Sequence, residues 1–344
     1  MKKKIFAVII LISCGFLSLA LREGEKFSRQ GFSMDTLINM TVYADDPKIL
    51  DDAYKLLHRL DKELSMYDPS SDISEINFNA GVKSVKVPDE VVEAVENSLR
   101  LYELTDGVFN PLIGPVTKLW KINKADADKI PSRSELDEAV KLSDIKNLEI
   151  NPDENEIFLK VKGCVLDLGG IAKGYASEKI ISLIKNSGIK SALVDLGGNV
   201  YVLGRKTDGS EWNIGVRNPL EVRGSPALVL RVHDTAVITS GGYERFKTVG
   251  GERYGHFFDA SGNSVRNDLL SATVITPDGS LGDGLATAFM AAGYEKSLGI
   301  LKRLPDDTGV IFIRLIGDDV EFFLTGNLRD VIAASEYKIN FIDD

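Results

Sequence analysis

The sequence predicts an α+β fold in which helices pack on layered mixed and antiparallel sheets. Strand and helix patterns are mixed without the strict strand–helix–strand order of a parallel sheet. Several later strands are joined by connections too short for a crossover, which favours antiparallel pairing. The chain has 344 residues, 44% of them hydrophobic, and no segment clearly divides it. We therefore expect residues 22–344 to form one folded domain.

The first 21 residues have the pattern of an export signal. Three lysines precede an apolar run that extends from Ile5 to Leu21. Three outcomes fit it: residues 11–14 resemble a lipoprotein cleavage box that would leave Cys14 lipidated, residues 18–20 suit ordinary signal cleavage, and the run is long enough to stay as a tilted anchor. We favour the lipoprotein, exported and held at the extracytoplasmic face of the inner membrane.

Composition excludes several classes of protein. The formal net charge of −10 makes nucleic acid an unsuitable partner, and the aromatic content of 8% argues against disorder. Beyond the signal Cys164 is the only cysteine, so the mature domain has no intramolecular disulfide. An acidic protein needs a local device, such as a metal ion or a helix terminus, to hold an anionic ligand.

The first third of the chain predicts a strand and then a helix. Residues 37–44 have a strand pattern. Asp46 and Pro47 form a helix start, with Asp as the cap and Pro at the first position, and leucines at helical spacing continue to Ser65. A polar turn is expected over residues 67–74.

A second helix is expected from about residue 88 to 105, where Asp106-Gly107 stops it. Residues 108–115 contain too many prolines for regular structure and are too apolar for an ordinary surface loop, so we expect them to line a pocket. Next we expect a peripheral polar stretch at 123–133 and a short helix at 134–142. Two strands should follow, at 148–150 and 156–160.

The chain is organised around residues 167–176, Asp-Leu-Gly-Gly-Ile-Ala-Lys-Gly-Tyr-Ala. They follow an apolar run, 164–166, which we interpret as a buried strand, and they lead into a helical pattern over 175–185. Free N–H groups at the helix start, together with Lys173, favour a phosphate ligand. The stretch matches neither the Walker pattern nor the dinucleotide fingerprint. On these residues alone, a tight turn with no ligand is as good an interpretation.

The Asp-Leu-Gly-Gly tetrapeptide recurs at 195–198, between expected strands at 192–196 and 200–203. Two strands that end in the same tetrapeptide suggest paired loops on one edge of a sheet. Further strands are expected at 212–216, 227–232, 236–240, 271–276, 310–315 and 320–325, and the last two of these should form a hairpin. A helix is expected at 283–301, and a polar strand should end the chain.

Two groups of side chains could carry chemistry. Asp283 and Thr287 lie one helical turn apart and offer the hard oxygen ligands that Mg2+ accepts. Equally, Asp283 could cap the helix while Thr287 packs in its body. His256 stands among aromatic residues, close in sequence to Glu244-Arg245. It is either a general base or a core histidine.

Taken together, eleven ordered blocks resemble the ApbE family, the FAD:protein FMN transferases. The blocks are residues 34–36, 64–67, 74–77, 107–111, 114–115, 119–120, 167–176, 194–199, 240–245, 254–259 and 282–288. The resemblance runs from about Phe32 to the final strands. It implies an ApbE-like architecture, related to the T-fold.

The resemblance also implies an activity. Mg2+ and FAD would bind, and a Thr or Ser hydroxyl of a target protein would attack the FMN phosphate of FAD and release AMP. By resemblance the metal ligands are Asp283, Thr287 and a backbone oxygen near Gly170, and His256 deprotonates the hydroxyl. The residues expected in the FAD pocket are Met34, Ser65, Tyr67, Asn110, Lys173, His256 and Phe257.

Three positions depart from the family pattern. Asp35 stands where the family commonly has Gly, and Asn110 and Gly242 stand where it commonly has Asp. These changes leave the metal pair and His256 intact, so we expect an active enzyme. The resemblance also implies that its acceptor is a subunit of a redox complex. Two alternatives stay open: a lipoprotein that carries FAD without chemistry, and a hydrolase that splits FAD into FMN and AMP.

Overall fold

The computed structural model describes residues 24–122, 129–221, 226–243, 245–266 and 268–342. The predicted export signal with Cys14, and most of the polar stretch that follows residue 122, lie outside these ranges. Within them, none of the helices combines the length and the apolar character needed to span a bilayer.

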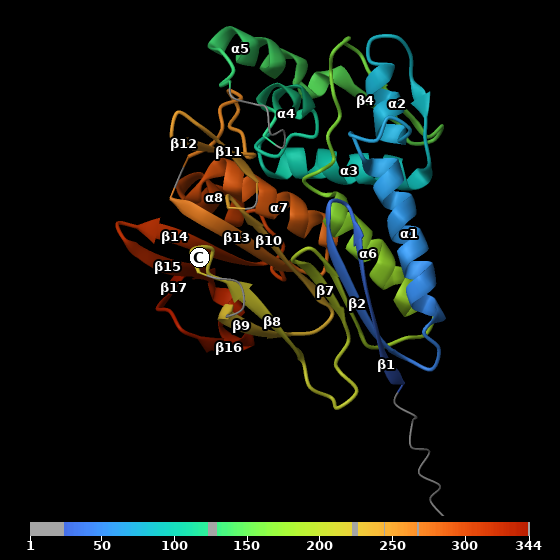
Figure 1. Cartoon of the computed structure of the whole chain (residues 1–344), viewed down its shortest axis with the longest axis vertical. Helices are drawn as coiled ribbons and strands as arrows, with labels where there is room; N and C mark the ends of the chain where they lie inside the picture. The colour runs from blue at the N-terminus through green and yellow to red at the C-terminus, as the bar shows by residue number, and fades with distance from the viewer. Residues whose placement is uncertain (1–23, 123–128, 222–225, 244, 267, 343–344) are drawn as a thin grey trace, which may run out of the picture.

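A sheet of nine strands forms the centre of the molecule (Figure 1). Neighbouring strands are antiparallel except for the parallel pair β15 and β17. In spatial order the strands are β1 (Glu25–Ser33), β2 (Thr36–Ala44), β6 (Ala192–Leu196), β7 (Asn199–Leu203), β10 (Thr235–Gly241), β13 (Leu269–Thr276), β14 (Gly309–Ile316), β15 (Asp319–Thr325) and β17 (Ile339–Ile342).

Helices cover one face of this sheet and a second sheet covers the other. Helix α6 (Ala172–Asn186) packs on β6 and β7, and α7 (Gly279–Ala292) packs on β10 and β13 (Figure 1). An outer layer adds α1 (Lys48–Leu64) on α6 and α3 (Asp89–Leu104) on α7. Apolar side chains of the opposite face pack against a small sheet of β16 (Ile332–Ser335), β9 (Pro226–Val232) and β8 (Trp212–Arg217). Because each layer buries one apolar face, the predicted α+β class is confirmed.

Most of the other elements lie around the helical face, whereas the 3-10 helix Gly326–Val331 packs with β9 on the opposite face. They are α2 (Asp72–Phe78), α4 (Gly114–Trp120), α5 (Arg133–Leu142), α8 (Tyr294–Leu301), the short 3-10 helices Ile145–Asn147 and Gly326–Val331, the sheet of β3 (Val85–Lys86), β5 (Glu156–Leu159) and β4 (Leu148–Asn151), and the hairpin of β11 (Phe246–Val249) and β12 (Glu252–Gly255).

The prediction of a strand at residues 164–166 is wrong. The segment is buried but joins no sheet. The amide of Asn77 replaces a neighbouring strand, because its Nδ2 donates to the Leu166 carbonyl at 3.0 Å and its Oδ1 accepts from the Leu166 N–H at 2.6 Å. The idea of two strand-end loops therefore holds only for the second tetrapeptide, which forms the turn between β6 and β7.

Helix boundaries also differ from the prediction. The helix expected over 283–301 is two helices, because Gly293 has φ 75° and ends α7. Helix α7 begins four residues earlier than expected, and Asp278 caps it by accepting the Leu281 N–H at 2.8 Å. Asp283 is therefore inside the helix and is not its cap. Two short helices were missed: α2 lies partly within the predicted polar turn, and α4 starts in the proline-rich segment.

Candidate active site

Glycines allow α6 and α7 to cross closely. A Cβ on Gly174 would lie 2.0 Å from the carbonyl oxygen of Gly279 and 2.7 Å from the Cβ of Asp283. This approach lets the Gly174 N–H donate to Asp283 Oδ2 at 2.9 Å. The backbone of one helix thus fixes a carboxylate on the other.

Asp283 is only 2% exposed. A buried carboxylate is costly unless hydrogen bonds or charges compensate it. Besides the Gly174 N–H, Lys173 contributes its ammonium, 3.9 Å from Asp283 Oδ1. At that length the Lys173 contact is loose, so Oδ1 stays available to a second cation.

The other predicted metal ligands lie one turn further along the same crossing. Thr287 Oγ1 lies 3.4 Å from the carbonyl oxygen of Gly170. A Cβ on Gly170 would lie 2.9 Å from Phe109 Cε2 and 3.3 Å from Thr287 Cγ2, so only glycine fits here without displacement. The crossing therefore brings together the carboxylate, hydroxyl and carbonyl oxygens predicted from sequence.

This donor set fits Mg2+ better than a transition metal. In the part of the chain that the structure describes, no three His, Cys, Asp or Glu side chains form a group that could hold a metal ion. A single carboxylate with a hydroxyl and a carbonyl leaves several positions to water and substrate phosphates, as Mg2+ prefers. The site thus suits a metal that binds together with an anionic substrate.

His256 follows β12 directly. Its Nδ1 lies 3.0 Å from the carbonyl oxygen of Arg245. Because a carbonyl only accepts, Nδ1 carries the proton and Nε2 presents a lone pair. Phe257 is buried beside it, with the two rings 4.1 Å apart.

Desolvation by the surrounding protein lowers the pKa of His256 to about 4. The hydrogen bond to the Arg245 carbonyl opposes this shift, whereas the positive charges of Arg245 and Lys173 add to it. His256 is therefore neutral at pH 7, the state that a general base requires. The influence of Lys173 also places the imidazole within electrostatic reach of the helix crossing.

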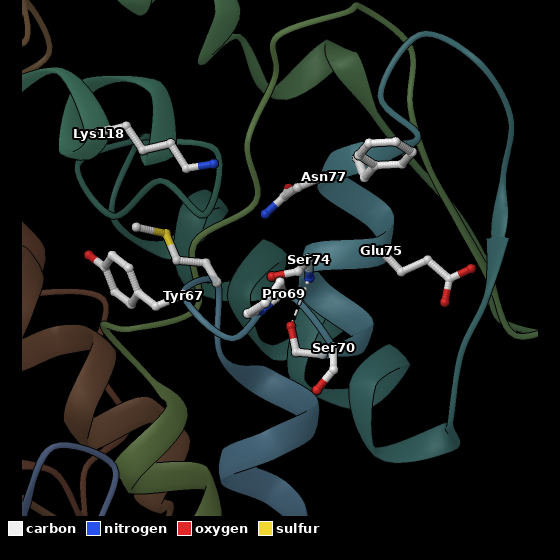
Figure 2. A pocket seen from close by; sticks show the side chains of 10 residues that line it. Tyr67, Pro69, Ser70, Ser74, Glu75, Asn77 and Lys118 are labelled. Atoms are coloured by element: carbon white, nitrogen blue, oxygen red, sulfur yellow. Dashed lines mark hydrogen bonds between the residues drawn. The ribbon is translucent and has the colours of Figure 1, made fainter.

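Tyr67 lines an open cleft of about 550 Å³. Figure 2 shows Tyr67 and Lys118 on one side of this cleft and Ser74 and Asn77 of α2 on the other. Although much of its side chain is exposed, Tyr67 has its pKa raised to about 12 by desolvation and by the charge of Asp167. Of the residues predicted to bind FAD, Tyr67 is the one that lines this cleft.

Two predicted pocket residues use their polar groups to shape loops. Ser65 Oγ accepts the N–H groups of Tyr67 and Asp68, both at 3.2 Å. Asn110 Nδ2 donates to the Ser143 carbonyl at 2.8 Å. The Asp that is common at this position in the family has no N–H and could not donate this hydrogen bond. For Ser65 and Asn110, contact with FAD stays a prediction.

Met34 and Asp35 form the turn between β1 and β2, with φ of 49° and 57°. Asp tolerates the left-handed conformation better than most residues with a side chain, which accommodates the loss of the family glycine. The Met34 N–H donates to Asp61 Oδ2 at 2.8 Å. The charge of Asp35 also helps to raise the pKa of Tyr67, so this turn lies near the Tyr67 phenol.

Sequence reasoning assigned no role to Asp167. Its Oδ1 accepts the Gly169 N–H at 2.9 Å and its Oδ2 accepts from Thr117 at 3.1 Å. Burial nevertheless raises the pKa of this carboxyl. The repeated tetrapeptide was the available signal, because Asp195 accepts the Gly198 N–H at 2.7 Å in a similar way.

Comparisons with known proteins identify the family of this chain. The model of the ApbE family matches residues 34–312, the part of the chain that contains every predicted site residue. A curated FAD:protein FMN transferase of Treponema pallidum (strain Nichols) is 34% identical over 318 residues, or 87% of this chain and 88% of the relative. One from Klebsiella pneumoniae (strain 342) is 28% identical over 322 residues, or 93% and 96% of the two chains.

Solved structures show the same architecture. The flavin transferase ApbE from Vibrio cholerae aligns with a TM-score of 0.79 at 25% identity and covers 89% of this chain and 99% of its own. The apo form of the flavinyl transferase ApbE from Pseudomonas stutzeri gives 0.80 at 27% identity, with 92% and 99% covered. The predicted ApbE-like architecture is confirmed.

Proposed function

This chain belongs to the ApbE family, and on that basis we propose how it transfers FMN from FAD to a protein. The reaction takes place where α6 and α7 cross. The observation that supports this location is the meeting of a buried carboxylate, a hydroxyl and a carbonyl from two helices, at Asp283, Thr287 and Gly170. These three groups would hold Mg2+, and Lys173 would contact the pyrophosphate.

The chemistry is one phosphoryl substitution. A Thr or Ser hydroxyl oxygen of the acceptor forms a bond to the FMN phosphorus of FAD. The bond from that phosphorus to the bridging oxygen breaks, and AMP leaves with the oxygen and its electron pair. A bound Mg2+ supplies charge neutralisation on the pyrophosphate.

His256 removes the proton from the attacking hydroxyl. Its Nε2 holds the free lone pair, because Nδ1 donates to the Arg245 carbonyl. The proton therefore moves from the acceptor oxygen to Nε2. A residue that only binds FAD would not need this fixed tautomer, which favours the transferase over a passive carrier.

Mass spectrometry of the acceptor tests the proposal. The full chain is incubated with FAD, Mg2+ and an acceptor peptide of the family type, Asp-Gly-x-Thr-Gly-Ala-Thr, and the peptide is weighed intact. We expect a gain equal to one FMN phosphoryl group in wild type and little gain with His256→Ala. FAD bound but unchanged would support the carrier. FMN and AMP without adduct would show a hydrolase.

The pH dependence of transfer should reflect the lowered pKa of His256. Because desolvation brings that pKa to about 4, the neutral base persists well below the usual histidine range. We expect kcat/KM to stay level from about pH 7 to pH 5 and to fall as pH approaches 4. A profile with its acidic limb at pH 6 to 7, absent in His256→Gln, would contradict this prediction.

We also propose that the protein is exported and anchored at the extracytoplasmic face of the inner membrane, with Cys14 lipidated. The support is the lysine-rich start followed by an apolar run. A redox-complex subunit in the same compartment would then be the acceptor. Fatty-acid labelling of wild type that persists in Cys14→Ser would overturn the lipid anchor.

A further inference from the structure

His256 is placed by a hairpin that has little core of its own. Strands β11 and β12 pair only with each other, and His256 follows the second strand directly. Of the residues in these two strands, all of which the structure describes, only Lys247 is buried. Isolated two-stranded hairpins are at best marginally stable in water, so this one needs an external attachment.

Lys247 provides that attachment. It is 8% exposed, and its Nζ donates to the carbonyl oxygens of Trp120 at 2.7 Å and Lys129 at 2.8 Å. The ammonium also lies 5.2 Å from the centre of the Trp120 indole, within cation–π range. One buried cation thus binds the hairpin to the end of α4 and to the start of the segment leading into α5. Figure 1 shows the β11–β12 hairpin next to α4.

Trp120 contacts the hairpin on both sides of His256. Its indole packs against Tyr254, with ring centres 5.5 Å apart, and against Phe258, at 6.0 Å. Its Nε1 donates to the Gly262 carbonyl at 2.7 Å. The residues two before and two after His256 are therefore held by the same buried side chain.

The other partner of His256 belongs to the same hairpin. Arg245, whose carbonyl accepts the Nδ1 proton, precedes Lys247 by two residues. Lys247 is directly opposite Tyr254 in the ladder. Fixing Lys247 thus fixes both the hydrogen-bond acceptor that sets the imidazole tautomer and the strand that leads to the ring.

We propose that Lys247 and Trp120 are positioning residues for His256 and act as a clamp on the β11–β12 hairpin. The proposal rests on the role given to His256 in the proposed function. Without the clamp, the hairpin would separate from α4, and the imidazole, now only partly exposed, would be more fully exposed to water. The base would lose both its orientation and its desolvated surroundings.

The titration of His256 itself tests the clamp without turnover. The chain has three histidines, so the His256 ring proton signal in NMR can be assigned by comparison with His256→Gln. The charges near the ring, those of Arg245 and Lys173, are unchanged by a substitution at 247. We expect Lys247→Met to raise the pKa of His256 by at least one unit towards 6.5, because its lowering comes mainly from desolvation.

Kinetics gives the second readout. Lys247→Met should lower kcat by about tenfold to a hundredfold, a partial loss of the roughly 10²- to 10⁴-fold that general-base catalysis contributes, while the dissociation constant of FAD stays within about twofold. Lys247→Arg keeps donors for both carbonyls and should restore most of kcat and the low pKa of His256. Trp120→Phe loosens the clamp from the other side and should raise that pKa too.

Lys179→Met is the matched control. Lys179 also combines a hydrogen bond, to Glu93, with a cation–π contact at 5.1 Å, to Tyr175, but it lies on α6 away from the hairpin. We expect no change in the titration of His256. A folded Lys247→Met protein whose His256 titrates as in wild type would overturn the clamp, even if wild type proved unable to transfer FMN.

Discussion

Asp283→Ala is expected to reduce FMN transfer on the order of 10³-fold, the loss typical of removing a charge-stabilising group from a catalytic site. The substitution deletes the carboxylate of the candidate metal site. It also leaves the Gly174 N–H without its acceptor inside the helix crossing. The adduct rate, measured against Mg2+ concentration, reports the first effect, and the free energy of unfolding reports the second.

Asp283→Asn separates these two effects. Its amide oxygen can still accept the Gly174 N–H in a side chain of nearly the same shape, so the fold should be retained. The negative charge that attracts Mg2+ is absent. We therefore expect unfolding close to wild type and transfer almost as low as in the alanine variant. Normal activity of Asp283→Asn at wild-type Mg2+ concentrations would remove Asp283 from the metal site.

Gly174→Ala is expected to have the largest effect on stability. The added Cβ would lie 2.0 Å from the Gly279 carbonyl oxygen, a backbone atom that a side-chain rotation cannot move away. The two helices would have to separate, which we expect to cost on the order of 4 kcal/mol. Denaturant unfolding measures the loss. Transfer should fail as well, because Asp283 moves with α7.

Gly299→Ala is the control for the same chemical change. Gly299 is exposed in α8, and its added Cβ would meet no atom within 4 Å. Alanine favours a helix over glycine by about 1 kcal/mol, so this variant should be as stable as wild type or more stable. If both substitutions changed the free energy of unfolding equally, the α6–α7 crossing would tolerate the separation of its two helices.

The apolar pattern predicted most strands because burial alternates along them. In β8, for example, Trp212, Ile214 and Val216 are buried and the residues between them are exposed. The same signal failed at Leu166, where burial is real but the hydrogen-bond partner is Asn77, 89 residues earlier. An apolar run predicts burial; it does not predict which group satisfies the backbone.

The start of α7 was missed for a different reason. Gly279 and Gly282 lower helix propensity, so the sequence pattern predicts a helix only from Asp283 onwards. At Gly279, as at Gly174, a Cβ would press into the backbone of the facing helix. The glycines are explained by a tertiary contact between segments about a hundred residues apart, which local propensity does not contain.

The candidate site was partly predictable. The spacing of Asp283 and Thr287 placed both side chains on one helix face, and the family resemblance added Gly170. Lys247 gave no such signal, because a lone lysine in a polar hairpin is expected in solvent. Its burial depends on two backbone carbonyls more than a hundred residues away.

The β1–β2 hairpin sets the distance between Glu25 and the turn at Met34 and Asp35. Its nine-residue ladder pairs Glu25 with Ala44 at one end and reaches the turn at Met34 and Asp35 at the other, about 30 Å away. For a chain tethered to a membrane ahead of Glu25, that ladder is a rigid spacer. The predicted flavin pocket would then lie on the side remote from the tether, and the acceptors within reach would be those whose hydroxyl projects well into the aqueous compartment.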